Sequence, residues 1–144
     1  MPLTEKLLVL AMAAQVLLAV AILVMMGRER VPRVISGEIP MADIAVERSA
    51  YPLRARLLSN NFDNQFQLPI LFFVAALLAL QIGFVGWVEV LFAWAFVVLR
   101  YVHAAIHITS NHVLHRFMVY SAGLAVLVLF WLWLVGKILL VPSI

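Results

Sequence analysis

The sequence contains no cysteine among its 144 residues. That absence excludes disulfide bonds, thiolate metal sites and cysteine nucleophiles, so any sulfur chemistry needs a thiol from another molecule. Charged residues are also scarce: they make up 12% of the chain, whereas apolar residues make up 66%. With so few charges a soluble domain would lack a polar surface, and the mean hydropathy is +1.10. The composition therefore indicates an integral membrane protein in a lipid bilayer.

Four apolar runs can cross a bilayer as helices, since about 20 residues rising about 1.5 Å each match a hydrocarbon layer of about 30 Å. The first run, from Leu7 to Met26, is uncharged, with Gln15 as its one amide. No small-residue cleavage site follows it, so an uncleaved helix is expected. The predicted spans cover about residues 5–27, 62–84, 87–109 and 115–138, with a loop at about residues 28–60. We therefore predict one all-α membrane domain over residues 1–144, a four-transmembrane-helix bundle.

Helix-breaking and capping residues indicate where these helices begin and end. Four residues of the first loop argue against a continuous helix through it: Pro32, Gly37, Pro40 and Pro52. Asn60 or Asn61 is expected to cap the second span, with Asp63 near the positive end of the helix dipole. Gly83 and Gly86 predict a short turn near the end of that span.

The basic residues predict the orientation of the chain in the membrane. Six of the ten Lys and Arg residues lie between Arg28 and Arg56, and Arg116 follows the third span. The turn between the second and third spans has no Lys or Arg. By the positive-inside rule, the 28–60 loop is expected to be cytoplasmic and the termini outside. The net charge of +3 is thus a topology signal and a source of lipid-phosphate contacts, and no nucleic-acid partner is expected.

Polar residues that are costly in lipid gather near the predicted cytoplasmic face. Arg100, His103 and His107 lie on one stripe of the third span, so they are expected to face other helices. Residues of the other spans reach a similar depth: Arg28, Asn64, Gln67, Arg116 and Tyr120. Together they predict a cationic pocket suited either to an anionic ligand with several carboxylates or to a phospholipid head group.

Each of these residues also has a structural interpretation. Arg100 and His103 could form interhelical hydrogen bonds, Arg116 could act only as a topology anchor, and Asn64 could only cap or join helices. His103 and His107 have a spacing that suits metal ligands, but a third ligand would have to come from His112 or His115. No carboxylate is near in sequence, so no metal site is predicted.

Three segments form a combined pattern: Asn64-Gln-Phe-Gln-Leu-Pro-Ile-Leu-Phe-Phe73, Trp94-Ala-Phe-Val-Val-Leu-Arg-Tyr-Val-His103 and His107-Ile-Thr-Ser-Asn111. This pattern resembles bacterial members of the MAPEG superfamily, the membrane-associated proteins of eicosanoid and glutathione metabolism. The resemblance covers nearly the whole chain and is greatest to microsomal prostaglandin E synthase, with microsomal glutathione transferases also similar. It implies a homotrimer of four-helix subunits in a bacterial inner membrane, with glutathione sites between neighbouring subunits.

The resemblance also implies roles for individual residues. Arg116 would be catalytic, because a cation beside the glutathione sulfur favours the thiolate. Contacts with glutathione would come from Arg28, Asn64, Gln67, Arg100, His103, His107 and Tyr120.

The chain departs from the family pattern at several positions. Gln67 stands in place of a glutamate, His107 in place of a tyrosine, and Phe117 in place of a serine. Two functions are therefore expected as alternatives. The first is a glutathione-dependent transferase or peroxidase that acts on a lipophilic small molecule, and the second is a non-catalytic lipid-binding or structural membrane subunit.

Overall fold

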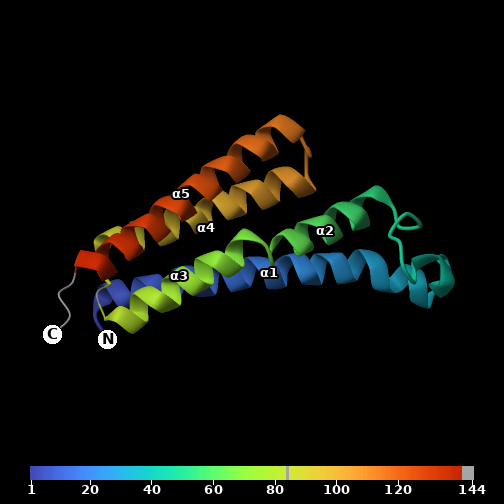
Figure 1. Cartoon of the computed structure of the whole chain (residues 1–144). Helices are drawn as coiled ribbons and strands as arrows, with labels where there is room; N and C mark the ends of the chain where they lie inside the picture. The colour runs from blue at the N-terminus through green and yellow to red at the C-terminus, as the bar shows by residue number, and fades with distance from the viewer. Residues whose placement is uncertain (84, 141–144) are drawn as a thin grey trace.

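The computed structural model describes residues 1–83 and 85–140, which form helices joined by turns and one longer loop (Figure 1). The elements are α1 (Leu3–Ile35), the short 3-10 helix η1 (Met41–Ile44), α2 (Leu53–Asn64), α3 (Leu68–Ile82), α4 (Trp87–Ile108) and α5 (Val113–Leu140). α2 and α3 follow each other as one apolar unit, Leu53–Ile82. With α1, α4 and α5 this gives four candidate membrane spans among the described residues. The predicted all-α four-helix membrane fold is confirmed.

The helices run between two ends of the molecule. At the terminal end, the N-terminus lies beside the α3–α4 turn, where the Thr4 hydroxyl donates a hydrogen bond to the Val85 carbonyl oxygen at 2.6 Å. The loop end carries residues 36–52 and the turn between α4 and α5 (Figure 1). α1 packs along α2, α3 and α4, and α5 packs mainly along α4. This arrangement brings one end of every membrane span to the loop end.

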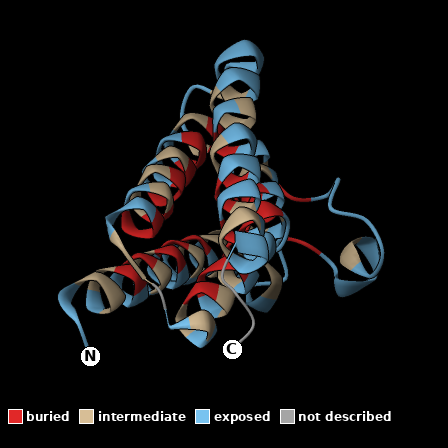
Figure 2. Cartoon of the chain, turned by 60° about the vertical axis from the view of Figure 1, so that its left-hand side comes forward, coloured by how far each residue is buried: buried red, intermediate tan, exposed pale blue. Residues whose placement is uncertain are grey.

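Small residues and stacked aromatic rings form the core between the helices. Ala75, Ala76 and Ala93 are fully buried, which allows the helix backbones to approach closely. The rings of Phe72 and Phe96 stack with centroids 4.9 Å apart and join α3 to α4. Buried residues lie on the faces that the helices turn toward one another, whereas the exposed outer faces are largely apolar, as contact with lipid requires (Figure 2).

The first helix is longer than predicted. α1 continues through Pro32 to Ile35, beyond the predicted span of about residues 5–27, although no continuous helix runs through the whole of the predicted loop. Pro32 removes one backbone hydrogen bond, and only three residues of α1 follow it, so the cost of this proline to the helix is small. Arg33 pairs with Glu38 at 2.8 Å just beyond the end of the helix, and the chain turns at Gly37, whose φ of 77° is left-handed.

The second membrane unit also begins earlier than predicted. α2 starts at Leu53, so neither Asn60 nor Asn61 caps it, and Asp63 lies near its C-terminal end rather than at a positive helix end. Asp63 instead accepts a hydrogen bond from Arg48 at 2.6 Å, which raises the pKa of the Arg48 guanidinium above its ordinary value. Both side chains are well exposed, so this pair contributes little to stability.

The predicted turn at Gly83 and Gly86 is confirmed, and it introduces an ion pair that was not predicted. Gly83 ends α3 with a left-handed φ of 75°, and the Gly86 backbone N–H donates to Glu89 at 2.9 Å. Glu89 is only 1% exposed; its carboxylate pairs with Lys137 at 2.6 Å and accepts a hydrogen bond from the Trp133 indole at 2.7 Å. This cluster joins the start of α4 to the end of α5.

We expect Glu89→Gln to destabilise the bundle by about 2–3 kcal/mol, because the change removes the charge that Lys137 pairs with in a poorly hydrated setting. The measurement is unfolding of the purified protein in mixed detergent micelles, followed by circular dichroism. The control is Glu47→Gln, which removes a carboxylate from the exposed loop and should change stability by less than about 0.5 kcal/mol. Equal unfolding midpoints for the two variants would contradict this role for Glu89.

Candidate functional site

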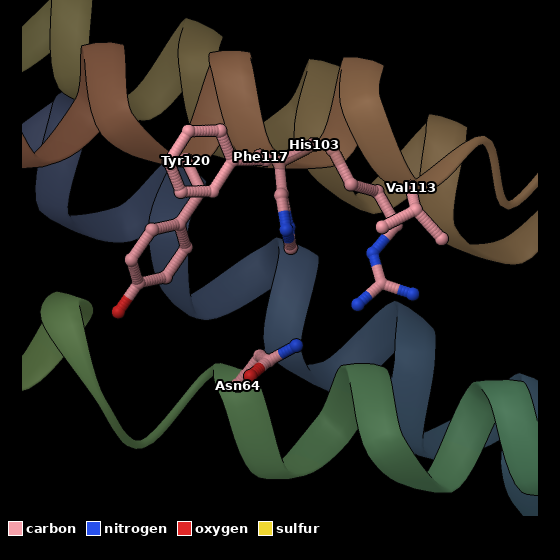
Figure 3. A pocket seen from close by; sticks show the side chains of 6 residues that line it. Asn64, His103, Val113, Phe117 and Tyr120 are labelled. Atoms are coloured by element: carbon pink, nitrogen blue, oxygen red, sulfur yellow. The ribbon is translucent and has the colours of Figure 1, made fainter.

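Two adjoining pockets lie at the loop end between α2 on one side and α4 and α5 on the other (Figure 3). The first has a volume of about 250 Å³ and is lined by Asn64, His103, Val113, Arg116, Phe117 and Tyr120. The second has a volume of about 360 Å³ and is lined mainly by polar residues, namely Asn60, Asp63, Asn64, Gln67, His107, Asn111 and Arg116, together with Leu57. Asn64 and Arg116 line both pockets, so the two form one continuous site.

The turn between α4 and α5 positions Arg116. Asn111 adopts a left-handed conformation with φ of 48°, which asparagine tolerates, and its side-chain oxygen accepts a hydrogen bond from Arg116 Nη1 at 2.5 Å. Arg116 Nε is buried and has no hydrogen-bond partner among the described residues. Asn111 therefore fixes the Nη1 side of the guanidinium, and Nε remains without a partner and could donate a hydrogen bond to a ligand.

α4 places a second guanidinium behind the pocket. Arg100 is only 2% exposed, and its Nη2 donates to the Asn64 carbonyl oxygen at 3.0 Å. Its Nε and Nη1 have no hydrogen-bond partner, and Arg100 forms no ion pair with a carboxylate within the described part of the chain. Buried charges are normally paired or hydrogen-bonded, so this arrangement favours an anion close by.

Two buried histidines complete this stripe of α4. The His103 ring lies 5.8 Å from the His107 ring and 5.8 Å from the Tyr120 ring, measured between centroids. Nδ1 of both histidines is buried without a hydrogen-bond partner among the described residues. In Figure 3, His103 points from α4 toward Asn64 on α2. The site thus combines two arginines with neutral hydrogen-bonding groups from three helices.

A chain of hydrogen-bonded buried amides lies beside the site. Gln15 of α1 donates to the Gln65 side-chain oxygen at 2.9 Å, and Gln65 donates to the Asn61 side-chain oxygen at 2.9 Å. The Asn61 amide reaches the Ala104 carbonyl oxygen of α4 at 3.5 Å. These bonds join α1, α2 and α4 beside Asn64. The hydrogen bond between Gln65 and Asn61 was not predicted. The sequence feature that could have indicated such a network is Gln15, the one amide of an otherwise apolar span.

The structure brings most of the predicted site residues together. Asn64, His103, Arg116 and Tyr120 line the first pocket, and Gln67 and His107 line the second. Arg100 lies behind Asn64 and contacts its backbone rather than lining either pocket.

Arg28 lies elsewhere in the single chain. It is exposed near the end of α1, beside a separate hollow of about 350 Å³ that Arg33 and Glu38 also line. His112 and His115 stack on each other at 4.1 Å and are exposed. Among residues 1–83 and 85–140, no three His, Asp or Glu side chains group as metal ligands would.

The fold and the site together define an integral membrane protein with four apolar spans and a cationic, hydrogen-bonding pocket at one end of the bundle. The chain belongs to the MAPEG family, whose model matches residues 8–136. That family includes glutathione transferases and peroxidases, and its members commonly use glutathione. Searches of curated proteins and of solved structures gave no match.

We expect Gln65→Leu to lower the stability of the bundle by about 1–2 kcal/mol, since Gln15 and Asn61 would lose their buried partner. Gln81→Leu is the matched control, because it removes the same group from an exposed position of α3. Unfolding in mixed micelles measures both changes. If Gln81→Leu proved as costly as Gln65→Leu, the amide chain would not be a stabilising element.

Proposed function

We propose that the protein is a glutathione-dependent membrane transferase or peroxidase that acts on lipophilic electrophiles. The observation that carries the proposal is Arg116, which lines both pockets, keeps Nε without a hydrogen-bond partner and has no carboxylate partner within the described residues, while Arg100 adds a second positive charge behind Asn64. The carboxylate that lines the second pocket, Asp63, is paired with Arg48 instead. The site is therefore suited to an anionic ligand.

Glutathione carries hydrogen-bonding groups that match the polar atoms left without partners within the described residues. Its carboxylates can accept hydrogen bonds from guanidinium and imidazole groups, and its peptide groups can bond to Asn64 and Tyr120. Among the residues that line the two pockets, the buried atoms without a hydrogen-bond partner within the described residues are His103 Nδ1, His107 Nδ1 and Arg116 Nε. An anion that satisfies them would remove an electrostatic and desolvation cost that the free protein carries.

When bound, glutathione would supply a thiolate nucleophile. Arg116 would favour the thiolate by its positive charge and would stay oriented through its hydrogen bond to Asn111. Asn64, His103 and Tyr120 would hold the tripeptide, and Gln67 would add a neutral contact where the family pattern has a carboxylate. Arg100 would fix the backbone of Asn64 and add positive charge from behind.

The first pocket also has an apolar side. Val113 and Phe117, which line it, are strongly exposed on the outer surface of α5. In a bilayer this surface would be reached by lipophilic molecules dissolved among the acyl chains. The proposed electrophile would thus enter beside α5 and meet a nucleophile held on the polar side.

Oligomerisation would complete the site. We propose a homotrimer in which Arg28, remote from the pocket of its own chain, contacts the ligand bound by a neighbouring copy. The arginine-rich loop would face the cytoplasm of a bacterium, with the protein in the inner membrane.

A second candidate is a non-catalytic MAPEG-like subunit that binds lipid or stabilises a membrane assembly. Gln67 favours it, because this exposed amide cannot provide the charge that would pair with the ammonium group of glutathione. Phe117 favours it as well, because an apolar ring occupies the position that follows the arginine of α5.

Conjugation of glutathione to a chloronitrobenzene separates the two candidates. We expect Arg116→Ala to lower the enzymatic rate by about 100-fold or more, as the removal of one charge-stabilising group at a reacting centre typically does. The control Arg56→Ala removes an exposed arginine from the same end of the molecule and should retain the rate. Rates equal to the uncatalysed background in both the wild type and Arg116→Ala would support the non-catalytic candidate.

Glutathione should also raise the thermal stability of the purified protein in neutral detergent. A ligand that binds only the folded state stabilises it by about 2.7 kcal/mol at a hundred times its dissociation constant. The unfolding temperature should therefore increase with glutathione concentration, and less so for Arg116→Ala than for Arg56→Ala. A glutathione-independent unfolding temperature, together with stabilisation by a phospholipid, would assign the pocket to a lipid head group.

A further inference from the structure

An apolar groove lies at the loop end, and none of the residues that line it also lines either pocket of the proposed glutathione site. It has a volume of about 420 Å³ and runs along the last turns of α1 beneath η1 and Tyr51. Its apolar walls come from Leu23, Met26, Val31, Val34, Ile44 and Tyr51. Neither the fold nor the proposed activity requires this groove.

The length of α1 places the groove at the boundary of the membrane. At about 1.5 Å per residue α1 is about 50 Å long, so it extends well beyond a hydrocarbon layer of about 30 Å. The uncharged run ends at Met26, and the groove continues from Leu23 to Ile35 across that point. Val31 is 53% exposed and Ile35 is 80% exposed beyond the run. Apolar surface at this depth favours contact with the acyl chain of a lipid rather than with water.

Arg30 is the one cation among the described residues that line the groove. The Arg30 guanidinium carbon lies 4.5 Å from the centre of the Tyr51 ring, and Arg30 Nη2 donates to the Tyr51 hydroxyl oxygen at 3.3 Å. Nη1 donates a weak hydrogen bond to the Met26 sulfur, at 3.7 Å. Glu29, the adjacent carboxylate, pairs with Arg33 and Arg54 instead. Within the described residues Arg30 thus has no anionic partner and keeps donors that a phosphate could use.

We infer that this groove binds an anionic phospholipid from the leaflet at the loop end. One acyl chain would lie along Leu23, Met26 and Val34, and the phosphate oxygens would accept hydrogen bonds from Arg30. The charge complementarity of a lone guanidinium beside an apolar wall selects a ligand that is anionic at one end and aliphatic at the other. This inference is independent of the glutathione proposal, because it uses a different surface.

Photolabelling tests the inference on the full-length protein. The probe is phosphatidylglycerol with a diazirine in one acyl chain, present at low mole fraction in phosphatidylcholine nanodiscs, and the adducts are mapped by mass spectrometry. We expect the adducts to concentrate in residues 23–51. The same diazirine on phosphatidylcholine should label these residues about five-fold less, the usual contribution of one basic residue to binding an anionic lipid.

Two variants address the head group and the acyl chain separately. Arg30→Gln should reduce labelling of residues 23–51 by phosphatidylglycerol about five-fold. Gly27→Leu should also reduce it, because the new side chain fills the groove that Gly27 lines. A Cβ at Gly27 meets no atom within 4 Å, and leucine favours a helix more than glycine does, so this variant should fold even if Arg30→Gln does not.

The matched controls are Arg56→Gln, which removes the same charge from an exposed site outside the groove, and Gly136→Leu, which adds the same side chain to a part of α5 with open space. Both should label as the wild type does. Adducts spread evenly over the lipid-facing helices, or labelling unchanged in Gly27→Leu, would overturn the inference. So would a disulfide between copies of an Ile44→Cys variant of this cysteine-free chain, since a second copy would then occupy the groove.

Discussion

The hydrogen-bond chain from Gln15 through Gln65 and Asn61 to the Ala104 carbonyl is the constraint around which the loop end is built. In a membrane, polar groups that find no partner are costly, so these amides bond to one another across helix boundaries. The result ties α1, α2 and α4 at one depth and places Asn64 immediately beside α4. Arg100 then bonds to the Asn64 backbone, and the pocket forms on the other side of that contact.

Polar groups serve different purposes at the two ends of the bundle. At the terminal end, the Glu89 carboxylate accepts hydrogen bonds from Gly86 and Trp133 and forms an ion pair with Lys137. These contacts join α4 to α5. At the loop end, Arg100 and Arg116 keep donors that find no partner among residues 1–83 and 85–140. A satisfied buried cluster stabilises a fold, whereas an unsatisfied cationic one favours a ligand. This contrast is the physical reason for proposing that the functional site of this MAPEG family member lies at the loop end.

The extension of α1 connects the bundle to its surroundings. By continuing through Pro32, α1 carries Arg28, Arg30 and Arg33 beyond the apolar span on a rigid helix instead of a loose loop. Arg33 is engaged by Glu29 and Glu38, and Arg30 lies over Tyr51 beside an apolar groove. In the sequence these arginines together predict which side of the membrane the loop occupies. In the structure each of them has different neighbours. Arg28, exposed and remote from the pocket of its own chain, has the placement that a contact with a neighbouring copy would need.

The sequence by itself determined the membrane class, the four apolar spans, the turn at Gly83 and the family, because composition and long apolar runs are local properties of the chain. It also indicated Arg100, His103 and Arg116, since ionisable residues near lipid are rare and costly. Only the tertiary structure decided that α1 continues through Pro32 and that α2 begins at Leu53. It also decided that Lys137 pairs with Glu89 and that Arg28 lies apart from the pocket. These outcomes depend on helices distant in sequence packing together, and partners across helices supply the hydrogen bonds and charges that local propensity does not specify.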